Sequence, residues 1–299
     1  MSIRFDGRVA VVTGAGGGLG RAHALGLAAR GARVVVNDLG RDGSPPESAS
    51  RVVAEIEAAG GTAVADGADV TRPETVAAMV ARAEDLWGRV DILVNNAGIL
   101  ADKSFAKMDM ASFRRVVDVH LIGSANCTRA VWDGMRARNY GRVVFTSSSS
   151  GLYGNFGQAN YAAAKAALVG LMNVLHLEGE KHDIRVNALA PMAQTAMTEG
   201  LFSPDEAALL TPEAVTPALL FLVGEDAPSR AILGAGAGSV AVTRIVESPA
   251  LFLGEAGNTP EGIAAHWADL SRPDGSAPLA DAFSQSRKFV QAARGRPFG

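Results

Sequence analysis

Short runs rich in β-branched residues alternate with longer stretches rich in alanine and leucine along most of this chain. The short runs barely alternate between apolar and polar residues, which is typical of strands that are covered on both faces. This order predicts βαβ units, whose right-handed crossovers place the strands in one parallel sheet. The seven expected strands are Arg8–Val12, Arg33–Asn37, Thr62–Ala65, Asp91–Asn95, Arg142–Thr146, Arg185–Leu189 and Gly238–Val242.

Helical stretches fill the intervals between these runs. They are expected near residues 19–30, 47–59, 73–87, 109–138, 159–180 and 213–223. The predicted fold class is therefore α/β: a single Rossmann-type, doubly wound parallel sheet of seven strands with helices on both faces. After Pro191 the segment MAQTAMTEGLFSPDEAALL, residues 192–210, is polar and contains scattered methionine and phenylalanine. This composition predicts a mobile flap. Residues 246–299 are expected to form a C-terminal extension with helices near 260–270 and 280–294, packed on the same domain or on a neighbouring subunit.

The composition argues against several classes of protein. The 299 residues carry a net charge of −3 and no basic run, so no electrostatic argument favours nucleic acid or an anionic membrane as a partner. No apolar run reaches the roughly 18 residues that a membrane helix needs. The single cysteine, Cys127, cannot form an internal disulfide, and the N-terminus has no signal-peptide pattern. We expect a soluble cytoplasmic protein without a metal site.

The first expected strand runs into the segment TGAGGGLG, which begins the first helix. Gly14, Gly18 and Gly20 have the spacing G-x-x-x-G-x-G, with Leu19 between the last two. Missing side chains at a strand-to-helix turn let phosphate groups reach backbone N–H groups at the helix N-terminus. A lone glycine loop is more often a flexible turn, but this one lies between a strong strand and a strong helix. The context predicts a dinucleotide-binding loop.

Asp38 directly follows the second expected strand. A carboxylate at this point accepts hydrogen bonds from the adenosine ribose hydroxyls and repels a 2′-phosphate, which favours NAD over NADP. Its alternative role is to cap the following turn. Further cofactor contacts are expected at the ends of the third and fourth strands, from Asp69, Val70, Asn95, Ala97 and Gly98.

Tyr161 and Lys165 are four residues apart on a strongly helical stretch, so their side chains share one face of the helix. An ammonium beside a phenol favours the phenolate and lowers a tyrosine pKa that is otherwise about 10. Tyr161 is therefore a candidate general acid and base for interconverting an alcohol and a ketone. An isolated pair of this kind is more often structural. Tyr153 has no lysine four residues later and is expected to line a pocket instead.

The segment TSSSSG, at the end of the fifth expected strand, supplies serines at the sheet edge that faces the same helix. A serine hydroxyl at this edge would hold the substrate oxygen beside the phenol. Ser147, Ser148, Ser149 and Ser150 all suit this role chemically, and spacing alone leaves the choice open. The strand end lacks the G-x-S-x-G pattern of a serine hydrolase.

Four segments together resemble the short-chain dehydrogenase/reductase family over roughly residues 5–245: TGAGGGLG, NNAG, the serine segment and YAAAK. The resemblance implies a dinucleotide-binding and catalytic domain over residues 1–245. It implies that Ser148, thirteen positions before Tyr161, orients the substrate oxygen, and that Tyr161 transfers the proton. Lys165 would lower the tyrosine pKa and bind the nicotinamide ribose, while hydride passes between the nicotinamide and the substrate carbon.

Two positions depart from the family's usual pattern. His120 stands in the long helix where the family usually has a catalytic asparagine. It is the fourth candidate catalytic residue, and it either supports a proton-relay water or packs within its helix. The turn after the sixth strand reads APMAQT in place of Pro-Gly, which leaves the cofactor contact near Pro191 and Met192 open.

One subgroup of the family is most similar to four longer segments of this chain: FDGRVAVVTGAGGGLGRAHAL, VVVNDLG, NNAGIL and YGNFGQANYAAAK. It is the (3R)-hydroxyacyl-CoA dehydrogenase domain of multifunctional enzyme type 2, also called 17β-hydroxysteroid dehydrogenase type 4. The resemblance implies an NAD-dependent oxidoreductase that interconverts a secondary alcohol and a ketone on a bulky apolar substrate. That substrate is a hydroxysteroid or a (3R)-3-hydroxyacyl-CoA. The alternative from another class is a dinucleotide-binding sensor or assembly subunit without turnover.

The charge of the flap favours an uncharged alcohol, such as a steroid, as the substrate. Between Arg185 and Arg230 there is no lysine or arginine, whereas coenzyme A is a polyanion that basic side chains usually bind. The alternative is that the acids of the flap stay solvated and that Lys103 or the C-terminal cations serve coenzyme A. The expected apolar walls are Leu152, Tyr153, Phe156, Met192, Met197 and Phe202. The family also implies a homodimer or homotetramer built on the helices near 109–138 and 159–180.

Overall fold

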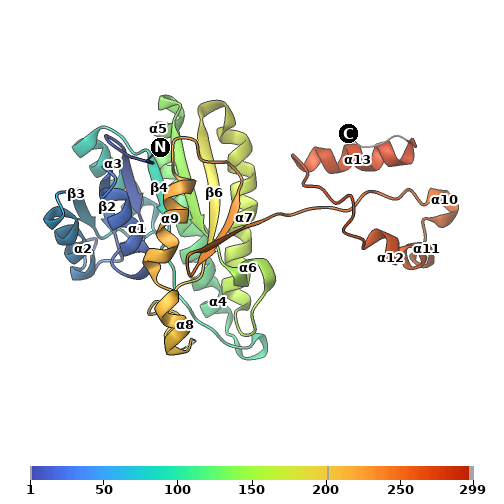
Figure 1. Cartoon of the computed structure of the whole chain (residues 1–299), viewed down its shortest axis with the longest axis horizontal. Helices are drawn as coiled ribbons and strands as arrows, with labels where there is room; N and C mark the ends of the chain where they lie inside the picture. Colours follow the sequence, from blue (N-terminus) through green and yellow to red (C-terminus); the bar gives the residue numbers. More distant parts are fainter. Residues whose placement is uncertain (1, 201, 296–299) are drawn as a thin grey trace. The chain divides into compact units, whose positions relative to one another are not determined.

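The computed structural model describes residues 2–200 and 202–295. Within these residues it has one sheet of eight strands in the order β3-β2-β1-β4-β5-β6-β7-β8 (Figure 1). Every pairing from β3 through β7 is parallel, which confirms the predicted α/β class with a parallel sheet. The strands are β1 (Val9–Val12), β2 (Arg33–Asn37), β3 (Thr62–Asp66), β4 (Ile92–Asn95), β5 (Gly141–Thr146), β6 (Ile184–Pro191), β7 (Ile232–Gly236) and β8 (Ser239–Thr243).

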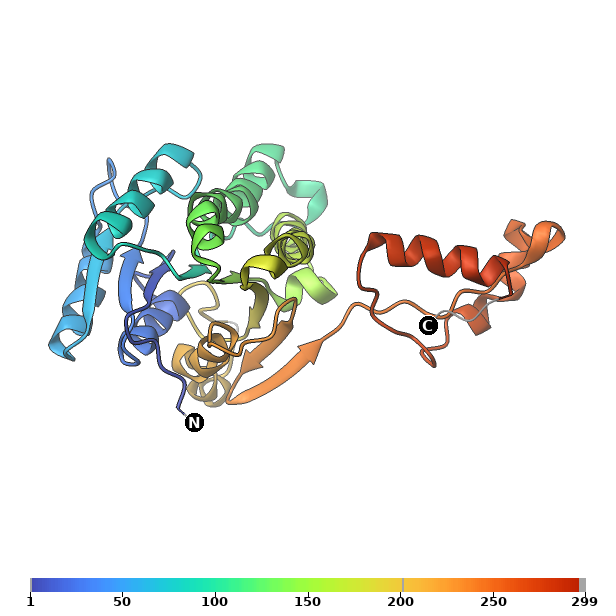
Figure 2. The ribbon, with the colours of Figure 1, turned by 90° about the horizontal axis from the view of Figure 1, so that it is seen from above.

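Helices connect the strands and cover both faces of the sheet (Figure 2). Those before the last two strands are α1 (Gly18–Ala28), α2 (Glu47–Ala58), α3 (Pro73–Trp87), α4 (Met110–Val117), α5 (Gly123–Arg138), α6 (Ser149–Tyr153), α7 (Ala159–Gly179), α8 (Pro204–Leu209) and α9 (Pro212–Leu222). A π-helical turn, η2 (Asp118–Ile122), joins α4 to α5, and short 3-10 turns lie at Phe105–Lys107 and Glu180–His182.

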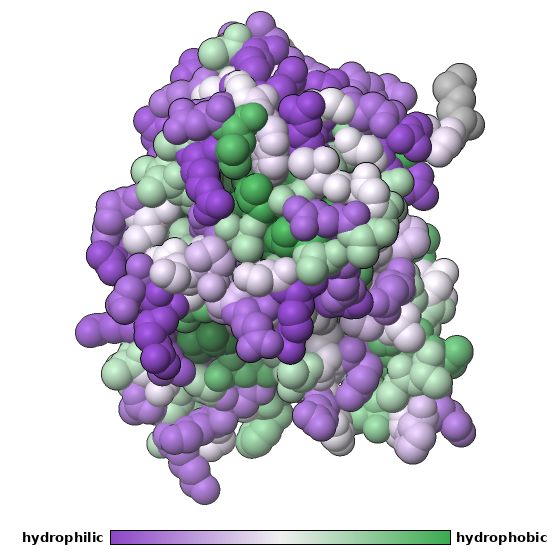
Figure 3. All heavy atoms as spheres, turned by 90° about the vertical axis from the view of Figure 1, so that its left-hand side faces the viewer, coloured by the Kyte–Doolittle hydropathy of each residue, from purple (hydrophilic) through white to green (hydrophobic). Residues whose placement is uncertain are grey.

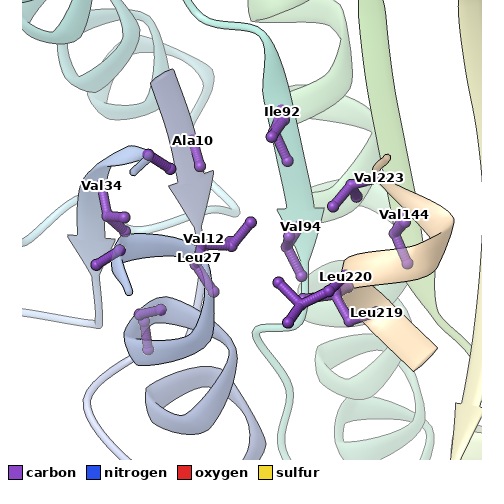
Figure 4. Close-up of a cluster of buried hydrophobic side chains, with 14 of the residues drawn as sticks. Ala10, Val12, Leu27, Val34, Ile92, Val94, Val144, Leu219, Leu220 and Val223 are labelled. Carbon is purple, nitrogen blue, oxygen red and sulfur yellow. The ribbon is translucent and has the colours of Figure 1, made fainter. Parts of the chain in front are cut away.

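Buried side chains alternate between the two faces of the sheet. Ala10 and Val12 of β1 pack in a layer with Leu27 of α1 and Leu219 of α9 (Figure 4). The intervening β1 residues, such as Val11, pack in the opposite layer with α3, α5 and α7. Because both faces are buried, the strands are nearly continuous apolar runs, as the sequence indicated. The side of the molecule that bears β3 and α2 presents hydrophilic side chains interspersed with apolar ones (Figure 3).

The predicted number of strands was wrong. The expected seventh strand, Gly238–Val242, corresponds to β8, and β7 at Ile232–Gly236 precedes it. The β7 sequence, ILGAG, has one β-branched residue and two glycines, so its intrinsic strand propensity is low. Pairing with β6 over Ala188–Pro191 stabilises it as a strand, and this contact between distant segments leaves no local signal.

The helical stretch predicted near 109–138 is present as α4, η2 and α5, with the π-helical turn between the two α-helices. The flap contains the helix α8, which was not predicted. Ser203 and Glu206 form a capping box at its start: the Ser203 hydroxyl accepts from the Glu206 N–H, and the Glu206 carboxylate accepts from the Ser203 N–H at 2.9 Å. The S-x-x-E signal for this cap was present in the sequence.

A second compact unit begins at Thr243. It contains α10 (Gly254–Gly257), α11 (Pro260–Ala265), α12 (Trp267–Leu270) and α13 (Ala282–Ala293), so the C-terminal end is helical as predicted. Glu247 and Ala277 form an antiparallel bridge, and the Lys288 ammonium donates to the Glu247 carboxylate at 2.8 Å. The expected packing of residues 246–299 on the domain or on a neighbouring subunit stays a prediction. No helix in the described part of the chain has the length and apolar character to cross a membrane.

Candidate active site

A cavity of about 900 Å³ lies where β1 through β6 end at their carboxyl edge. Open α/β sheets bind their ligands at this edge. Thirteen of the fourteen predicted catalytic and cofactor-binding residues line it: Gly14, Gly18, Leu19, Gly20, Asp38, Asp69, Val70, Ala97, Gly98, His120, Ser148, Tyr161 and Lys165. The fold therefore brings together, in one cavity, residues that are scattered over the first 165 positions of the chain.

The glycine loop has the backbone that a phosphate cradle needs. Gly14 has a φ of +62°, and a Cβ at this position would lie 2.8 Å from the Cα of Ala97. A side chain at Gly14 is therefore excluded by both conformation and space. The Asn96 amide holds the loop, because its Nδ2 donates to the carbonyls of Thr13 at 2.9 Å and Gly14 at 3.1 Å. The loop then leads to the N-terminus of α1 at Gly18, so these residues fit a pyrophosphate.

Asn95 is the one predicted cofactor residue that does not line the cavity. Its side chain is buried, and its Nδ2 donates to the Thr128 hydroxyl at 3.2 Å. Asn96, which was not among the predicted cofactor residues, lines the cavity instead. Successive side chains of a strand point to opposite faces, so a register error of one residue exchanges the inner asparagine for the outer one.

Asp38 lines the cavity, and two hydrogen bonds fix the orientation of its carboxylate. One oxygen accepts from the Leu39 N–H at 2.9 Å, and the other accepts from the Ser48 hydroxyl at 3.2 Å. The predicted turn-capping contact is therefore present, and the carboxylate also borders the cavity, where an adenosine ribose would lie. Asp69 also lines the cavity, and its carboxylate holds its own turn by accepting from the Thr71 N–H at 2.9 Å.

Three of the four adjacent serines have different hydrogen-bond partners, which separates them in a way that spacing did not. The Ser147 hydroxyl is buried and donates to the Lys165 carbonyl at 3.0 Å. The Ser150 hydroxyl donates to the Gln158 side chain at 2.7 Å. The Ser148 hydroxyl accepts from the Ser150 N–H at 3.1 Å, and its interaction with the Tyr161 phenol lowers the Tyr161 pKa. Ser148 and Tyr161, which the family spacing selects, both line the cavity.

Tyr161 and Lys165 lie side by side in the first turns of α7, and the Lys165 ammonium is 5.4 Å from the centre of the Tyr161 ring. The Lys165 ammonium donates to the Thr146 carbonyl, and burial lowers the Lys165 pKa to about 7. Burial also raises the pKa of Tyr161, a hydrogen bond from Ser148 opposes this, and the Asp102 charge adds to the rise.

The structure therefore does not bear out the predicted lowering of the Tyr161 pKa for the protein alone. The lysine loses its charge before the phenol ionises, and burial penalises the phenolate more than Ser148 stabilises it.

The walls of the cavity are only partly those predicted. Tyr153, Met192, Met197 and Phe202 line it. Leu152 packs against the core instead, and Phe156 is 89% exposed outside the cavity.

Asp102 and Gln158, which the sequence did not predict as site residues, also line the cavity. The Gln158 amide donates to the Asp102 carboxylate at 2.7 Å. The two residues are 56 positions apart, so no local pattern pairs them.

A model of the short chain dehydrogenase family matches residues 8–206, so the chain belongs to this family of oxidoreductases. Such enzymes use a nicotinamide dinucleotide and act on a small molecule. The peroxisomal multifunctional enzyme type 2 of Mus musculus is 46% identical over 272 residues, which is 89% of this chain and 37% of the mouse protein.

Two solved structures are also similar to this chain. Full-length peroxisomal multifunctional enzyme type 2 from Drosophila melanogaster has a TM-score of 0.82 at 36% identity, covering 98% of this chain and 51% of that one. A 7α-hydroxysteroid dehydrogenase in complex with NADH and 7-oxo glycochenodeoxycholic acid has a TM-score of 0.72 at 33% identity, covering 79% of this chain and 95% of that one. The chain thus spans 37% of the length of the mouse multifunctional enzyme and 51% of that of the fly enzyme.

Proposed function

We propose that this chain is an NAD-dependent dehydrogenase that oxidises a (3R)-3-hydroxyacyl-CoA to the 3-ketoacyl-CoA. The observation that carries the proposal is that Ser148, Tyr161 and Lys165 line the same cavity as the glycine loop, with the Lys165 ammonium 5.4 Å from the centre of the Tyr161 ring. Binding alone needs no such set, so the alternative of a dinucleotide-binding sensor or assembly subunit without turnover has less support.

Cofactor binding is assigned to the half of the cavity at β1 to β3. The glycine loop and the N-terminus of α1 would hold the pyrophosphate, and Asp38 would hold the adenosine ribose. The preference for NAD rests on the Asp38 carboxylate, because a 2′-phosphate placed beside it would be repelled. Lys165 would bind the nicotinamide ribose, as the family resemblance implies.

Proton transfer is assigned to Tyr161. Bound NAD supplies an acceptor for the hydride that leaves the carbinol carbon. Ser148 would hold the substrate oxygen by a hydrogen bond, and the Tyr161 phenolate would take the hydroxyl proton as the carbon–oxygen double bond forms. Because burial raises the Tyr161 pKa, the phenol is protonated near neutral pH in the protein alone. Alcohol oxidation should therefore accelerate as the pH rises, and ketone reduction should slow.

The choice of an acyl-CoA over a steroid is supported by the multifunctional relatives, which match 89% and 98% of this chain. The hydroxysteroid dehydrogenase matches 79%. Lys103 is exposed on the loop beside the cavity, where its backbone N–H donates to the Gly157 carbonyl at 2.9 Å, and it is a candidate cation for coenzyme A.

A hydroxysteroid is the second candidate substrate. Met192, Met197 and Phe202 give the flap side of the cavity an apolar wall, and the flap has no basic residue.

The test is NADH formation, followed by absorbance, with (3R)- and (3S)-3-hydroxyacyl-CoAs, a 17β-hydroxysteroid and a 7α-hydroxysteroid. We expect the (3R)-acyl-CoA to have the highest kcat/KM, and NAD to be preferred over NADP. A higher kcat/KM for a steroid would contradict the acyl-CoA assignment. Absence of NADH with every alcohol would contradict the function, with the Tyr161→Phe variant as the background control.

We also propose a homodimer or homotetramer. Exposed apolar side chains lie on the helices expected to form the interface, including Met110, Ile122, Val174 and Leu177. Light scattering of the purified chain tests this assembly. The cytoplasmic location stays a prediction, and the mouse and fly relatives carry the word peroxisomal in their names.

A further inference from the structure

We propose that His120 is a neutral positioning residue, which fixes the loop after β4 against Tyr161 and does not carry the proton of the reaction. The inference rests on the proposed function, because positioning Tyr161 matters only if Tyr161 transfers the proton. It assigns a role to the histidine that replaces the family's usual asparagine, and that role differs from relaying a proton.

The π-helical turn η2 directs His120 away from solvent and toward the cavity. Its side chain is buried, with 2% of its surface exposed. Its Nε2 lies 2.8 Å from the carbonyl oxygen of Ile99 and 3.1 Å from the Ile99 N–H nitrogen. A π-helical turn inserts one residue per turn and so redirects the side chains that follow. The histidine thus contacts the first residue beyond the NNAG segment.

The neutral tautomer with the proton on Nε2 fits these contacts. In this form Nε2–H donates to the Ile99 carbonyl, which is the shorter of the two contacts. Nδ1 is buried and has no hydrogen-bond partner within the described residues, so in this tautomer it is an unpaired acceptor. The other tautomer would bury an N–H donor without an acceptor, which is the rarer and costlier arrangement in proteins.

The same ring packs on Tyr161. The His120 and Tyr161 ring centres are 5.1 Å apart, and their planes meet at 89°, an edge-to-face contact. A Cβ at Gly98 would lie 2.3 Å from Cε1 of the imidazole. The close approach that requires a glycine at this position is therefore the approach of the His120 ring. One imidazole touches the backbone at Gly98 and Ile99 on one side and the phenol on the other.

Other hydrogen bonds hold the same loop against the start of α7. The Asn160 amide, itself buried, donates to the Ala101 carbonyl at 3.0 Å, and Gln158 donates to Asp102 at 2.7 Å. Together with the contact of His120 with Ile99, these bonds make three contacts of the loop after β4. One contact joins the loop to η2, and two join it to the start of α7, which bears Tyr161. This arrangement leaves the phenol little freedom to move.

The surroundings of His120 disfavour its charged form. Lys165 and Tyr161 of α7 face it, the loop after β4 presents the backbone of Ile99, and Asp118 of its own turn is exposed to solvent. Burial, followed by the charge of Lys165, lowers the His120 pKa to about 3. The imidazole is therefore neutral at every pH at which the protein is expected to be active.

The first test uses the unmodified protein labelled with ¹⁵N at histidine, with the His120→Gln variant to assign the signal among the five histidines. We expect the His120 nitrogens to keep the shifts of the neutral Nε2–H tautomer from pH 5 to 9. Titration of His120 between pH 5 and 8, or a proton on Nδ1, would overturn the proposal. This result does not depend on turnover, so it stands even if no alcohol substrate is found and the proposed function fails.

The second test compares kcat and KM of His120→Ala and His120→Gln with the unmodified protein. Displacing a reacting group by about 1 Å costs on the order of 10²-fold, so we expect His120→Ala to lower kcat by about that factor with little change in KM. Glutamine can still donate to Ile99, so His120→Gln should recover about tenfold of that loss, with the limbs of the pH profile unmoved. His23→Gln is the matched control, because His23 is equally buried but lies outside the cavity.

Two results of the second test would overturn the proposal. One is an unchanged kcat in His120→Ala. The other is restoration of its activity by free imidazole in proportion to the unprotonated base, which is the signature of a lost proton carrier. If the alanine variant does not fold, the glutamine variant and the NMR measurement decide the question.

Discussion

The cavity has two halves that are built in different ways. The half at β1 to β3 consists of strand ends that follow one another in sequence, with glycine backbone and the carboxylates of Asp38 and Asp69 lining the space. The half at β4 to β6 gathers side chains from the loop after β4, the η2 turn, the end of β5 and α7. Backbone groups and carboxylates at strand ends can bind a dinucleotide, whereas proton transfer needs several side chains fixed by contacts between distant segments. Substitutions in the two halves should therefore have separable effects on binding and on turnover.

The largest effect is expected for Tyr161→Phe, which removes only the phenolic oxygen. General acid–base catalysis typically contributes 10²- to 10⁴-fold, so kcat should fall by about 10³- to 10⁴-fold. NAD affinity, measured by calorimetry, should stay within about twofold, because the ring and its contact with His120 remain. Full activity in this variant would show that Tyr161 does not transfer the proton.

Ser148→Ala should have the next largest effect. Removing one hydrogen-bond donor from a developing oxyanion typically costs about 10²- to 10³-fold, and we expect a loss of kcat in that range with NAD binding unchanged. Ser147→Ala is the matched control, since the Ser147 hydroxyl is occupied by the Lys165 carbonyl at 3.0 Å. Equal losses of kcat in the two variants would show that the serines act through the fold and not through the substrate oxygen.

The sequence predicted site residues best where the segments that contact each other lie close together along the chain. The glycine loop and Asp38 were placed correctly, because a strand, a turn and a helix follow one another there. Asn95 was chosen over Asn96, since a strand end is predicted only to within a residue or two while side-chain direction reverses at each step.

In the catalytic half, the helical spacing paired Tyr161 with Lys165, but the choice of Ser148 needed the family resemblance. The contacts of His120 with Ile99 and of Gln158 with Asp102 join segments 21 and 56 positions apart, and no pattern within either segment encodes them. The strand β7 was missed for the same reason, because its pairing with β6 outweighs its own weak propensity.

His23 is a buried histidine beneath the cofactor half of the cavity. We expect it to affect the stability of the protein and not its turnover. It lies in α1, its Nδ1 is 3.0 Å from the Thr216 hydroxyl of α9, and burial lowers its pKa to about 3. The unfolded chain then binds more protons than the folded protein below about pH 6.5, so stability is lost as the pH falls. Between pH 7 and 5 this loss is about 2 kcal/mol for one such histidine.

The measurement is urea unfolding of the unmodified protein and of His23→Gln at pH 7 and pH 5. The fall in the free energy of unfolding should be smaller in the variant by about 2 kcal/mol, with kcat at pH 7 retained. An identical pH dependence in the two proteins would contradict the assigned pKa of His23.

The smallest effect is expected for Asp38→Ala in the cofactor half. Loss of the carboxylate removes the repulsion of a 2′-phosphate, and we expect the ratio of kcat/KM for NAD to that for NADP to fall by about tenfold, or ~1.4 kcal/mol. The kcat with saturating NAD should change little. Unchanged discrimination would mean that Asp38 serves only its contacts with Leu39 and Ser48.

We propose that the two halves of this cavity hold cofactor and alcohol for direct hydride transfer. The most direct measurement is a single turnover with NAD and a (3R)-3-hydroxyacyl-CoA that carries deuterium on C3, followed by mass analysis of the reduced nicotinamide. We expect the deuterium to appear in the NADH formed by the unmodified protein, and Tyr161→Phe to bind NAD but to form almost no NADH. NADH without deuterium, or label transfer undiminished in Tyr161→Phe, would contradict it.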